Sequence, residues 1–473
     1  MSEDTRTMIA VDCGSSSCRV VEGCFENGQI TCRTIGRVSN KMYERDGYLY
    51  WDIRRLFDKI LDLLSLAVRE GRQIDSIAVC TWGVDFALFD KYGHMLQDPL
   101  SYRNSIGEKV LSSLSPKQMR ECFLRTGILC DKINSVYMLA GIKKTFPELY
   151  AQADCLLMIP DILNYFLTGV MQNEPSELST SQLCRAEETA IDSGICAWFG
   201  IDPSLFPPVG THGTRIGWMK RELLERIGAP YEIPVLCVPS HDTASAVLSI
   251  PSNGEPFGFI SSGTWSLVGA ELQKPVITEL AMQNRFTNET GAFGQINLLK
   301  NSPGMYINNR LREEYCREVN EDVPWSQIAA MAESAPYYEI IDLELEDFFH
   351  PVSMENCIRQ HLNIHSKQNA DFGVLFRTYY ESLAHLYAQT LSNLESTTGE
   401  IVENLYFLGG GTANRLLLRR TAEYSGKKVI VCSGESTSLG NLLAQLWYFH
   451  PDWTRDDLRD IARRSNRRLE LPF

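Results

Sequence analysis

The chain has 473 residues, of which 44% are hydrophobic, and its formal net charge is −14. The length suggests two domains, and the apolar share excludes a disordered chain. The negative charge argues against nucleic acid or an anionic membrane as a partner. It does not exclude ATP, because a few local groups bind the phosphates of a nucleotide. The amino end is polar, no apolar run reaches the ~18 residues of a membrane span, and the 14 cysteines are scattered, so we expect free thiols in a reducing cytoplasm.

The first 80 residues predict a mixed α/β sheet with an antiparallel hairpin at one side. Apolar runs at 8–12, 18–25 and 29–38 predict three strands, and Asn27-Gly28 between the last two is a strong hairpin signal. Apolar residues at helical spacing predict a helix over 51–68, which Gly71 ends, and residues 74–80 predict the next strand. The resulting order is strand, strand, strand, helix, strand.

The rest of the chain contains a weak echo of this opening. Residues 105–230 alternate helical and loop patterns and are the least informative stretch, and 231–238 predict another strand. From about residue 254, strands at 258–262 and 267–270 flank a Gly263–Ser266 turn, and later strands are expected at 405–408 and 428–431, with helices after each. The echo suggests two domains of similar build, each placing a turn of small residues at a shared cleft.

Three turns of small residues could bind phosphate or adenine. The segment from Asp12 to Arg19 could form a nest of N–H groups with serine donors, and Asp12 could hold Mg²⁺ through water. Gly263-Thr264 offers the same chemistry, and Gly409–Gly411 could let a flat or anionic group approach the backbone at the start of a helix. The alternatives are an ordinary hairpin turn for the first two and a flexible strand-to-helix turn for the third.

Asp242 is the candidate general base, because it follows a predicted strand and precedes small residues at the start of a helix. Asp is also among the best helix N-caps, so a purely structural role is the alternative. His241 could bond a sugar hydroxyl or be structural. The segment Trp82–Phe86 combines aromatic residues, a glycine and an acid, which suits either a sugar site or core packing. The sequence has no cluster of metal ligands, no nucleophile elbow and no Walker-type loop.

Taken in order, these segments resemble the FGGY carbohydrate kinases of the actin-like ATPase superfamily, over nearly the whole chain to about residue 450. The residues that carry the resemblance are Val11-Asp12-x-Gly14-x-Ser16-Ser17-x-Arg19, Gly47-x-Leu49-x-Trp51-Asp52-Ile53, Ile74–Ile77, Thr81–Phe86, Tyr102-Arg103, Ser240–Val247, Ser261–Leu267, Leu299–Asn301, Gly409-Gly410-Gly411-x-x-Asn414 and Glu435-x-Thr437-x-Leu439-Gly440-Asn441. The resemblance implies two actin-like (ribonuclease H-like) α/β domains with the active site in the cleft between them.

The resemblance also implies residue roles. Asp242 corresponds to the catalytic base, and the expected sugar site consists of Gly83, His241, Asp242, Thr243 and Asn301. The expected ATP contacts are Ser15, Ser16, Ser17, Cys18, Arg19, Thr264, Asn309, Gly410 and Gly411, with Asp12 on Mg²⁺ through water. The sequence departs from the family pattern at Cys18, where glycine is usual, at Asn309, where glutamine is usual, and at Thr412-Ala413, where Cys-Gln is common.

The implied function is ATP-dependent phosphorylation of a ketose, expected to be L-rhamnulose at its O1 hydroxyl. L-fuculose and L-ribulose are alternative substrates, and a catalytically silent sugar- or nucleotide-binding regulator or an actin-like polymerising scaffold are alternatives of other classes. We expect a domain at 1–248 with the sugar site, base and phosphate turn, and a domain at 249–473 with the nucleotide site. The expected partners are the ketose and Mg-ATP, without nucleic acid or membrane, for a monomer or homodimer.

Overall fold

The computed structural model describes residues 5–349, 351–363, 370–466 and 469–470, and it divides into two compact units. The first unit consists of the chain up to residue 254 together with 271–298 and 435–466. The second consists of 255–270, 299–434 and the described residues beyond 466. The chain thus returns to the first unit twice, whereas the division into functional domains at residue 248 stays a prediction.

The first unit is built on a six-stranded sheet of order β3-β2-β1-β6-β10-β9. Strands β1, β6 and β10 are parallel, while β2, β3 and β9 run antiparallel to their neighbours. The bounds are β1 (Arg6–Cys13), β2 (Ser17–Glu26), β3 (Gln29–Ser39), β6 (Ser76–Thr81), β9 (Thr214–Trp218) and β10 (Pro234–Cys237). The three predicted opening strands are confirmed, and so is their hairpin, because Asn27 and Gly28 both have positive φ, at 54° and 74°.

A second hairpin, β4 (Met42–Arg45) with β5 (Tyr48–Trp51), was not predicted. Its turn is Asp46-Gly47, with φ of 53° and 78°. An Asp-Gly pair between two strands is the same signal as Asn27-Gly28, so the sequence contained it.

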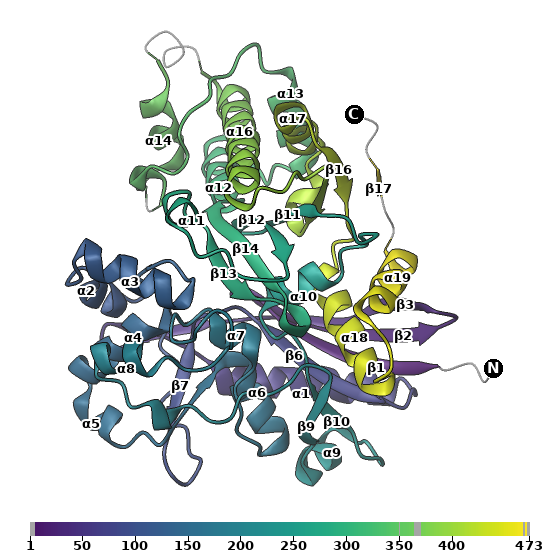
Figure 1. The fold of residues 1–473 in the computed structure, drawn as a ribbon. Coiled ribbons are helices and arrows are strands. Elements are labelled where there is room, and N and C mark those ends of the chain that lie inside the picture. The colour runs from purple at the N-terminus through teal and green to yellow at the C-terminus, as the bar shows by residue number, and fades with distance from the viewer. Residues whose placement is uncertain (1–4, 350, 364–369, 467–468, 471–473) are drawn as a thin grey trace. The chain divides into compact units, whose positions relative to one another are not determined.

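Helices cover both faces of this sheet (Figure 1), and the alternation of side chains along the strands divides the core of this unit into two layers. Ile9 and Val11 pack on the side of α1 (Ile53–Arg69) and α6 (Ile159–Thr168), while Met8 and Ala10 pack on the side of α10 (Asp242–Leu248) and α18 (Ser436–Phe449). The helix predicted over 51–68 is α1, which begins after the N-cap Asp52. The helix predicted after Glu435 is α18.

The stretch that the sequence left open, 105–230, is mostly helical and has a hydrophobic core of its own. The strand pair β7 and β8 forms a separate small sheet, whose alternate residues pack in this core and in the layer of α1 and α6. The remaining elements of the first unit are β7 (Phe86–Phe89), α2 (Ile106–Leu111), α3 (Pro116–Thr126), α4 (Ser135–Thr145), α5 (Pro147–Ala151), β8 (Cys155–Met158), α7 (Pro175–Ser179), α8 (Ser193–Phe199), η1 (Pro203–Leu205), α9 (Arg221–Ile227), α11 (Glu279–Gln283), β13 (Thr287–Thr290), η2 (Ala292–Gly294) and α19 (Arg455–Ser465).

The second unit repeats the strand arrangement of the first. Six neighbouring strands of its sheet run in the order β14-β12-β11-β15-β16-β17, with β11, β15 and β16 parallel and with β12 and β17 antiparallel to their neighbours. This matches β3-β2-β1-β6-β10-β9 strand for strand, and it gives the weak echo in the sequence a structural basis. The bounds are β11 (Phe257–Ser262), β12 (Trp265–Leu272), β14 (Ile296–Pro303), β15 (Asn404–Leu408), β16 (Lys428–Val431) and β17 (Leu469–Glu470).

The helices of the second unit are dominated by α16 (Phe372–Thr398), whose 27 residues include many buried side chains. The others are α12 (Tyr306–Val319), α13 (Trp325–Ser334), η3 (Glu346–Phe348), α14 (Met354–His361), η4 (Gly410–Ala413) and α17 (Arg415–Ser425). Along the described residues of both units, none of the helices combines the length and the apolar character needed to cross a bilayer.

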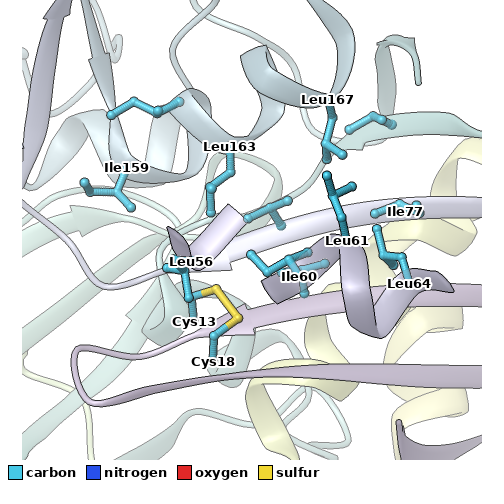
Figure 2. Close-up of a cluster of buried hydrophobic side chains, with 14 of the residues drawn as sticks. Cys13, Cys18, Leu56, Ile60, Leu61, Leu64, Ile77, Ile159, Leu163 and Leu167 are labelled. Carbon is cyan, nitrogen blue, oxygen red and sulfur yellow. A yellow bond between two sulfur atoms is a disulfide. The ribbon is translucent and has the colours of Figure 1, made fainter. Parts of the chain in front are cut away.

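The expectation of free thiols is wrong for one pair, because Cys13 and Cys18 form a disulfide (Figure 2). The antiparallel register of β1 and β2 places these residues directly opposite each other, with Cα atoms 3.9 Å apart. Both side chains are fully buried in the layer that contains Leu56 and Ile60 of α1. The other 12 cysteines are thiols. Sequence spacing alone did not show that the two strand ends would be in register.

We predict that a thiol titration of the denatured protein finds 12 thiols per chain before reduction and 14 after it. The two sulfur atoms of the disulfide do not react with the thiol reagent until the disulfide is reduced. A Cys13→Ser/Cys18→Ser double variant is the control and should give 12 in both conditions. A count of 14 without reduction would show that this pair stays reduced.

Candidate active site

The turn between β1 and β2 is closed by its own backbone and by Asn40. The Gly14 N–H donates to the Ser17 carbonyl at 2.9 Å, and the Asn40 side chain donates to the Gly14 carbonyl at 3.1 Å. Ser16 is exposed at its tip, whereas the Cys18 side chain lies in the core with Cys13. The extra side chain at Cys18 therefore points away from the exposed face of the turn, and only its backbone could contact a phosphate.

Two carboxylates bind Arg19 next to this turn. The Arg19 guanidinium donates to Asp12 Oδ2 at 2.7 and 2.9 Å, and its Nη1 lies 2.8 Å from Glu435 Oε2. Ser438 at the start of α18 donates to the same Asp12 oxygen at 2.9 Å. Burial alone would lower the pKa of Arg19, but Asp12 and Glu435 raise it above its usual value, so the guanidinium is charged. Sequence reasoning had assigned no role to Glu435 or Ser438.

The ends of β6 and β10 bring Gly83 and His241 together. The Thr81 N–H donates to the Ser240 carbonyl at 2.7 Å, and Thr81 pairs with His241 in a parallel bridge. A Cβ atom on Gly83 would lie 3.3 Å from His241 Nε2. Asp242 is the first residue of α10 and Thr243 the second, so Asp242 lies inside the helix rather than at the N-cap, which His241 occupies without a capping bond.

The backbone beside Gly83 is strained. Val84 has a φ of 71°, a left-handed conformation that is rare for a β-branched residue and costs about 1–3 kcal/mol. Thr180 and Ser135 hold it there: Thr180 Oγ1 accepts the Val84 N–H at 3.0 Å, and Ser135 Oγ donates to the Val84 carbonyl at 2.6 Å. Such strain persists where the surroundings fix it, and it is concentrated at functional sites.

The aromatic residues of the same segment are core residues. The side chains of Trp82 and Phe86 are 6% and 5% exposed. Asp85 Oδ2 accepts the indole N–H groups of Trp51 and Trp82 at 2.5 and 2.9 Å, and burial raises the pKa of Asp85 to about 7. This segment was expected to serve either a sugar site or core packing, and core packing holds for Trp82 and Phe86. Gly83 is the residue of the segment that lies near His241.

Two titratable groups of the first unit, His241 and Asp12, act on the candidate base, and a third, Glu289, contacts His241. His241 Nε2 lies 3.6 Å from Asp242 Oδ1, and His241 Nδ1 lies 3.2 Å from Glu289 Oε2 on β13. Burial raises the pKa of Asp242, His241 lowers it, and Asp12 raises it further. Glu289 carried no signal in the sequence analysis, because it lies in a stretch without a recognised motif.

The candidate nucleotide residues of the second unit lie in the turn after β11, at the start of α12 and in the glycine segment that packs against Ser262. Thr264 is exposed in the turn between β11 and β12, and its carbonyl accepts the Tyr306 N–H of α12 at 3.2 Å. Gly410 and Gly411 form the start of η4 directly after β15. A side chain at Gly411 would overlap the Ser262 hydroxymethyl group, so only glycine fits here.

The two predicted asparagines of the second unit are both exposed. Asn301 lies on β14, beside Lys300, which is ion-paired with Glu344 at 2.8 Å. Asn309 lies in the first turn of α12, while its neighbour Asn308 is buried and accepts the Tyr380 hydroxyl at 2.9 Å. Within this unit, Asn309 and Thr264 are therefore linked through the start of α12.

Comparison with known sequences decides the family. The pattern of the N-terminal domain of the FGGY family of carbohydrate kinases matches residues 7–249, and that of its C-terminal domain matches 258–449. The chain belongs to the FGGY family of carbohydrate kinases. It is 35% identical to a rhamnulokinase of Bacteroides thetaiotaomicron, over 93% of this chain and 90% of that one, and 33% identical to a rhamnulokinase of Bacillus subtilis, over 92% and 89%.

Solved structures support the fold. A gluconate kinase from Lactobacillus acidophilus matches with a TM-score of 0.81 at 13% identity, covering 98% of this chain and 93% of that one. Plasmodium falciparum glycerol kinase with ADP matches with a TM-score of 0.80 at 16% identity, covering 99% and 94%. The actin-like two-domain α/β fold of this family is therefore confirmed.

We predict that Thr180→Val weakens sugar binding through Val84. The substitution keeps the side-chain shape but removes the acceptor of the Val84 N–H, which costs about 1–3 kcal/mol where that group stays shielded. The KM for the sugar should rise several-fold and the KM for ATP should stay unchanged, as measured by ADP release. Thr180→Ser keeps the hydroxyl and is the matched control. Equal KM values for all three proteins would show that strain at Val84 has no role in the site.

Proposed function

We propose that the protein transfers the γ-phosphoryl group of ATP to the O1 hydroxyl of L-rhamnulose, giving L-rhamnulose 1-phosphate and ADP, as a step in the use of L-rhamnose. The observation that carries this proposal is the likeness to four relatives named rhamnulokinase, at 33–35% identity over 92–94% of the chain. An identity at this level that extends through both domains supports a shared substrate better than a shared fold does.

Asp242 is the proposed base, and its surroundings suit that role. Its side chain is 36% exposed, so a hydroxyl could reach the carboxylate. The raised pKa moves it from its ordinary value toward the working pH, which favours proton transfer from the attacking hydroxyl. Gly83, His241, Thr243 and, from the second unit, Asn301 would hold the sugar, with His241 Nε2 pointing to the space beside Gly83.

The phosphates are proposed to lie at the turn of Ser15, Ser16 and Ser17, with the Cys18 backbone and Arg19. The described residues contain no group of three or more His, Cys, Asp or Glu side chains arranged for a metal ion. Asp12 nevertheless fits Mg²⁺, which commonly takes one or two carboxylates, often through water, with the substrate phosphates as the other ligands. When bound, Mg²⁺ would neutralise charge on the transferring phosphoryl group.

The second unit is proposed to bind the rest of the nucleotide through Thr264, Asn309, Gly410 and Gly411. A domain of residues 1–248 would then carry the sugar, base and phosphate turn, and a domain of residues 249–473 would carry the nucleotide site. We place the enzyme in the cytoplasm, where ATP is supplied, as a monomer or homodimer.

We predict that ADP release with Mg-ATP is fastest with L-rhamnulose across a panel of L-rhamnulose, L-fuculose, L-ribulose and L-xylulose. The expected difference in kcat/KM is at least ~10-fold, because a sugar with another hydroxyl configuration or a shorter chain loses one or two contacts with the site. A preference for another ketose would change the substrate and keep the kinase. No sugar-dependent ADP with ATP still bound would favour a silent binder.

Asp242→Asn should lower kcat by a factor of ~10²–10⁴, the usual contribution of a general base, and leave ATP binding intact. The amide keeps the size of the side chain but accepts no proton at neutral pH. Turnover would be measured by ADP release and nucleotide binding by calorimetry. Near-normal turnover would remove Asp242 from the role of base.

A further inference from the structure

We propose that Glu289 is a positioning residue of the sugar site. Its carboxylate holds the imidazole of His241 by Nδ1, so that Nε2 presents a hydrogen-bond donor to the sugar between Gly83 and Asp242. This role deepens the proposed function and rests on it, because the sugar is the group that the donor would meet.

The first support is the geometry of the pair. Glu289 Oε2 lies 3.2 Å from His241 Nδ1, with 14% of the Glu289 side chain and 9% of the His241 side chain exposed. In the described part of the chain, neither of these two buried atoms has a hydrogen-bond partner, and their contact is an ion pair. A buried carboxylate without a partner is costly, so the ion pair is the contact that stabilises both side chains.

The second support is that β13 holds Glu289 in place from both sides. The backbone N–H of Asn288 and its side-chain amide both donate to the Gly127 carbonyl, at 2.9 and 3.0 Å. The Thr290 N–H donates to Ser179 Oγ at 2.9 Å, at the end of α7. A residue anchored at both neighbours loses little further freedom when it orients a partner, so Glu289 is preorganised for His241.

The orientation of His241 follows from this contact. The Nδ1 atom faces Glu289, so the opposite ring atom, Nε2, lies 3.6 Å from Asp242 Oδ1 and 3.3 Å from the point where a Cβ of Gly83 would be. The backbone N–H of His241 also donates to Ser176 Oγ at 3.0 Å. The backbone of His241 is therefore held by Ser176 and its ring by Glu289, and Nε2 lies on the side of the ring that faces Gly83.

The charges around His241 favour the protonated ring. Burial alone would lower the pKa of His241, but Glu289 on β13, Asp242 on α10 and Glu174 at the N-cap of α7 raise it to about 9. Glu174 acts through its charge, and it also accepts a hydrogen bond from Ser176 Oγ at 2.7 Å. Because the folded-state pKa lies above the ordinary value of ~6.5, the ring keeps its charge up to the folded pKa and loses it above. A charged ring donates from both nitrogens at neutral pH.

The test is the titration of His241 in Glu289→Gln, followed by NMR of the imidazole nitrogens in the full-length protein. The chain has eight histidines, and His241 is assigned as the signal absent from His241→Asn. We expect a midpoint near 9 in the wild type and a fall of at least ~1 pH unit in Glu289→Gln, because the neutral amide no longer stabilises the charge. Glu279→Gln on α11, which removes an exposed carboxylate paired with Arg120, is the matched control and should leave the midpoint unchanged.

The kinetic part compares the KM for the ketose in Glu289→Gln and wild type across pH. At about pH 8 at least half of the variant rings are neutral and the KM should rise about twofold or more, whereas near pH 6 both rings are charged and the ratio should approach one. The KM for ATP should stay unchanged. A purely structural defect would give a ratio that does not depend on pH. Glu289→Asp keeps the charge and should lie between wild type and Glu289→Gln in both measurements, which provides a test if the glutamine variant fails to fold.

An unchanged titration midpoint of His241 in Glu289→Gln would overturn the proposal. If the KM for the ketose rose while this midpoint stayed unchanged, Glu289 would contact the sugar directly. A lowered midpoint with a KM ratio that is flat across pH would overturn it as well. If the wild type phosphorylates none of the ketoses, the proposed substrate fails. A midpoint near 9 that falls in Glu289→Gln would still support the positioning of His241 by Glu289.

Discussion

The site of the first unit depends on the parallel pairing of three strands. In this register, Asp12 lies opposite Cys80, Thr81 pairs with His241, and the Thr81 N–H is bound by the Ser240 carbonyl. In an open α/β sheet, ligands bind at the carboxyl ends of the parallel strands, because the chain turns and helix starts collect there. Residues 12, 83 and 242 thus come from three distant segments and lie at one edge of one sheet. A slip of the register by one residue would turn their side chains to the opposite face.

The charges of the site follow a common pattern, in which each cation lies between two carboxylates. Arg19 is held by Asp12 and Glu435, and His241 by Glu289 and Asp242. Four acids against two cations leave an excess of negative charge, which opposes a triphosphate that arrives without a divalent ion. This balance is consistent with Mg-ATP, rather than free ATP, as the proposed co-substrate. It also gives the cations fixed positions before any ligand binds, and such preorganisation lowers the reorganisation needed during phosphoryl transfer.

The two units share one strand arrangement and use it differently. At corresponding places, the first unit has the Asp12–Arg19 turn and the strained segment at Gly83, whereas the second has the Thr264 turn and the glycines Gly409–Gly411. Charged and strained groups suit proton and phosphoryl transfer, while an uncharged glycine turn suits close approach by a flat ring or a phosphate. The duplication therefore provides two similar frames, and the residues at the strand ends decide what each could bind.

The sequence by itself determined the elements whose signals are local. Asn27-Gly28 specified the first hairpin through its positive φ, the apolar spacing of 53–67 specified α1, and the collinear segments identified the family and the position of Asp242. Only the tertiary structure decided which residues meet. The disulfide depends on the register of β1 and β2, the strain at Val84 on Thr180 and Ser135, and the orientation of His241 on Glu289, which follows it by almost 50 residues. These contacts join segments that are far apart in the chain or are set by strand register, and no local pattern in the sequence records a contact of that kind.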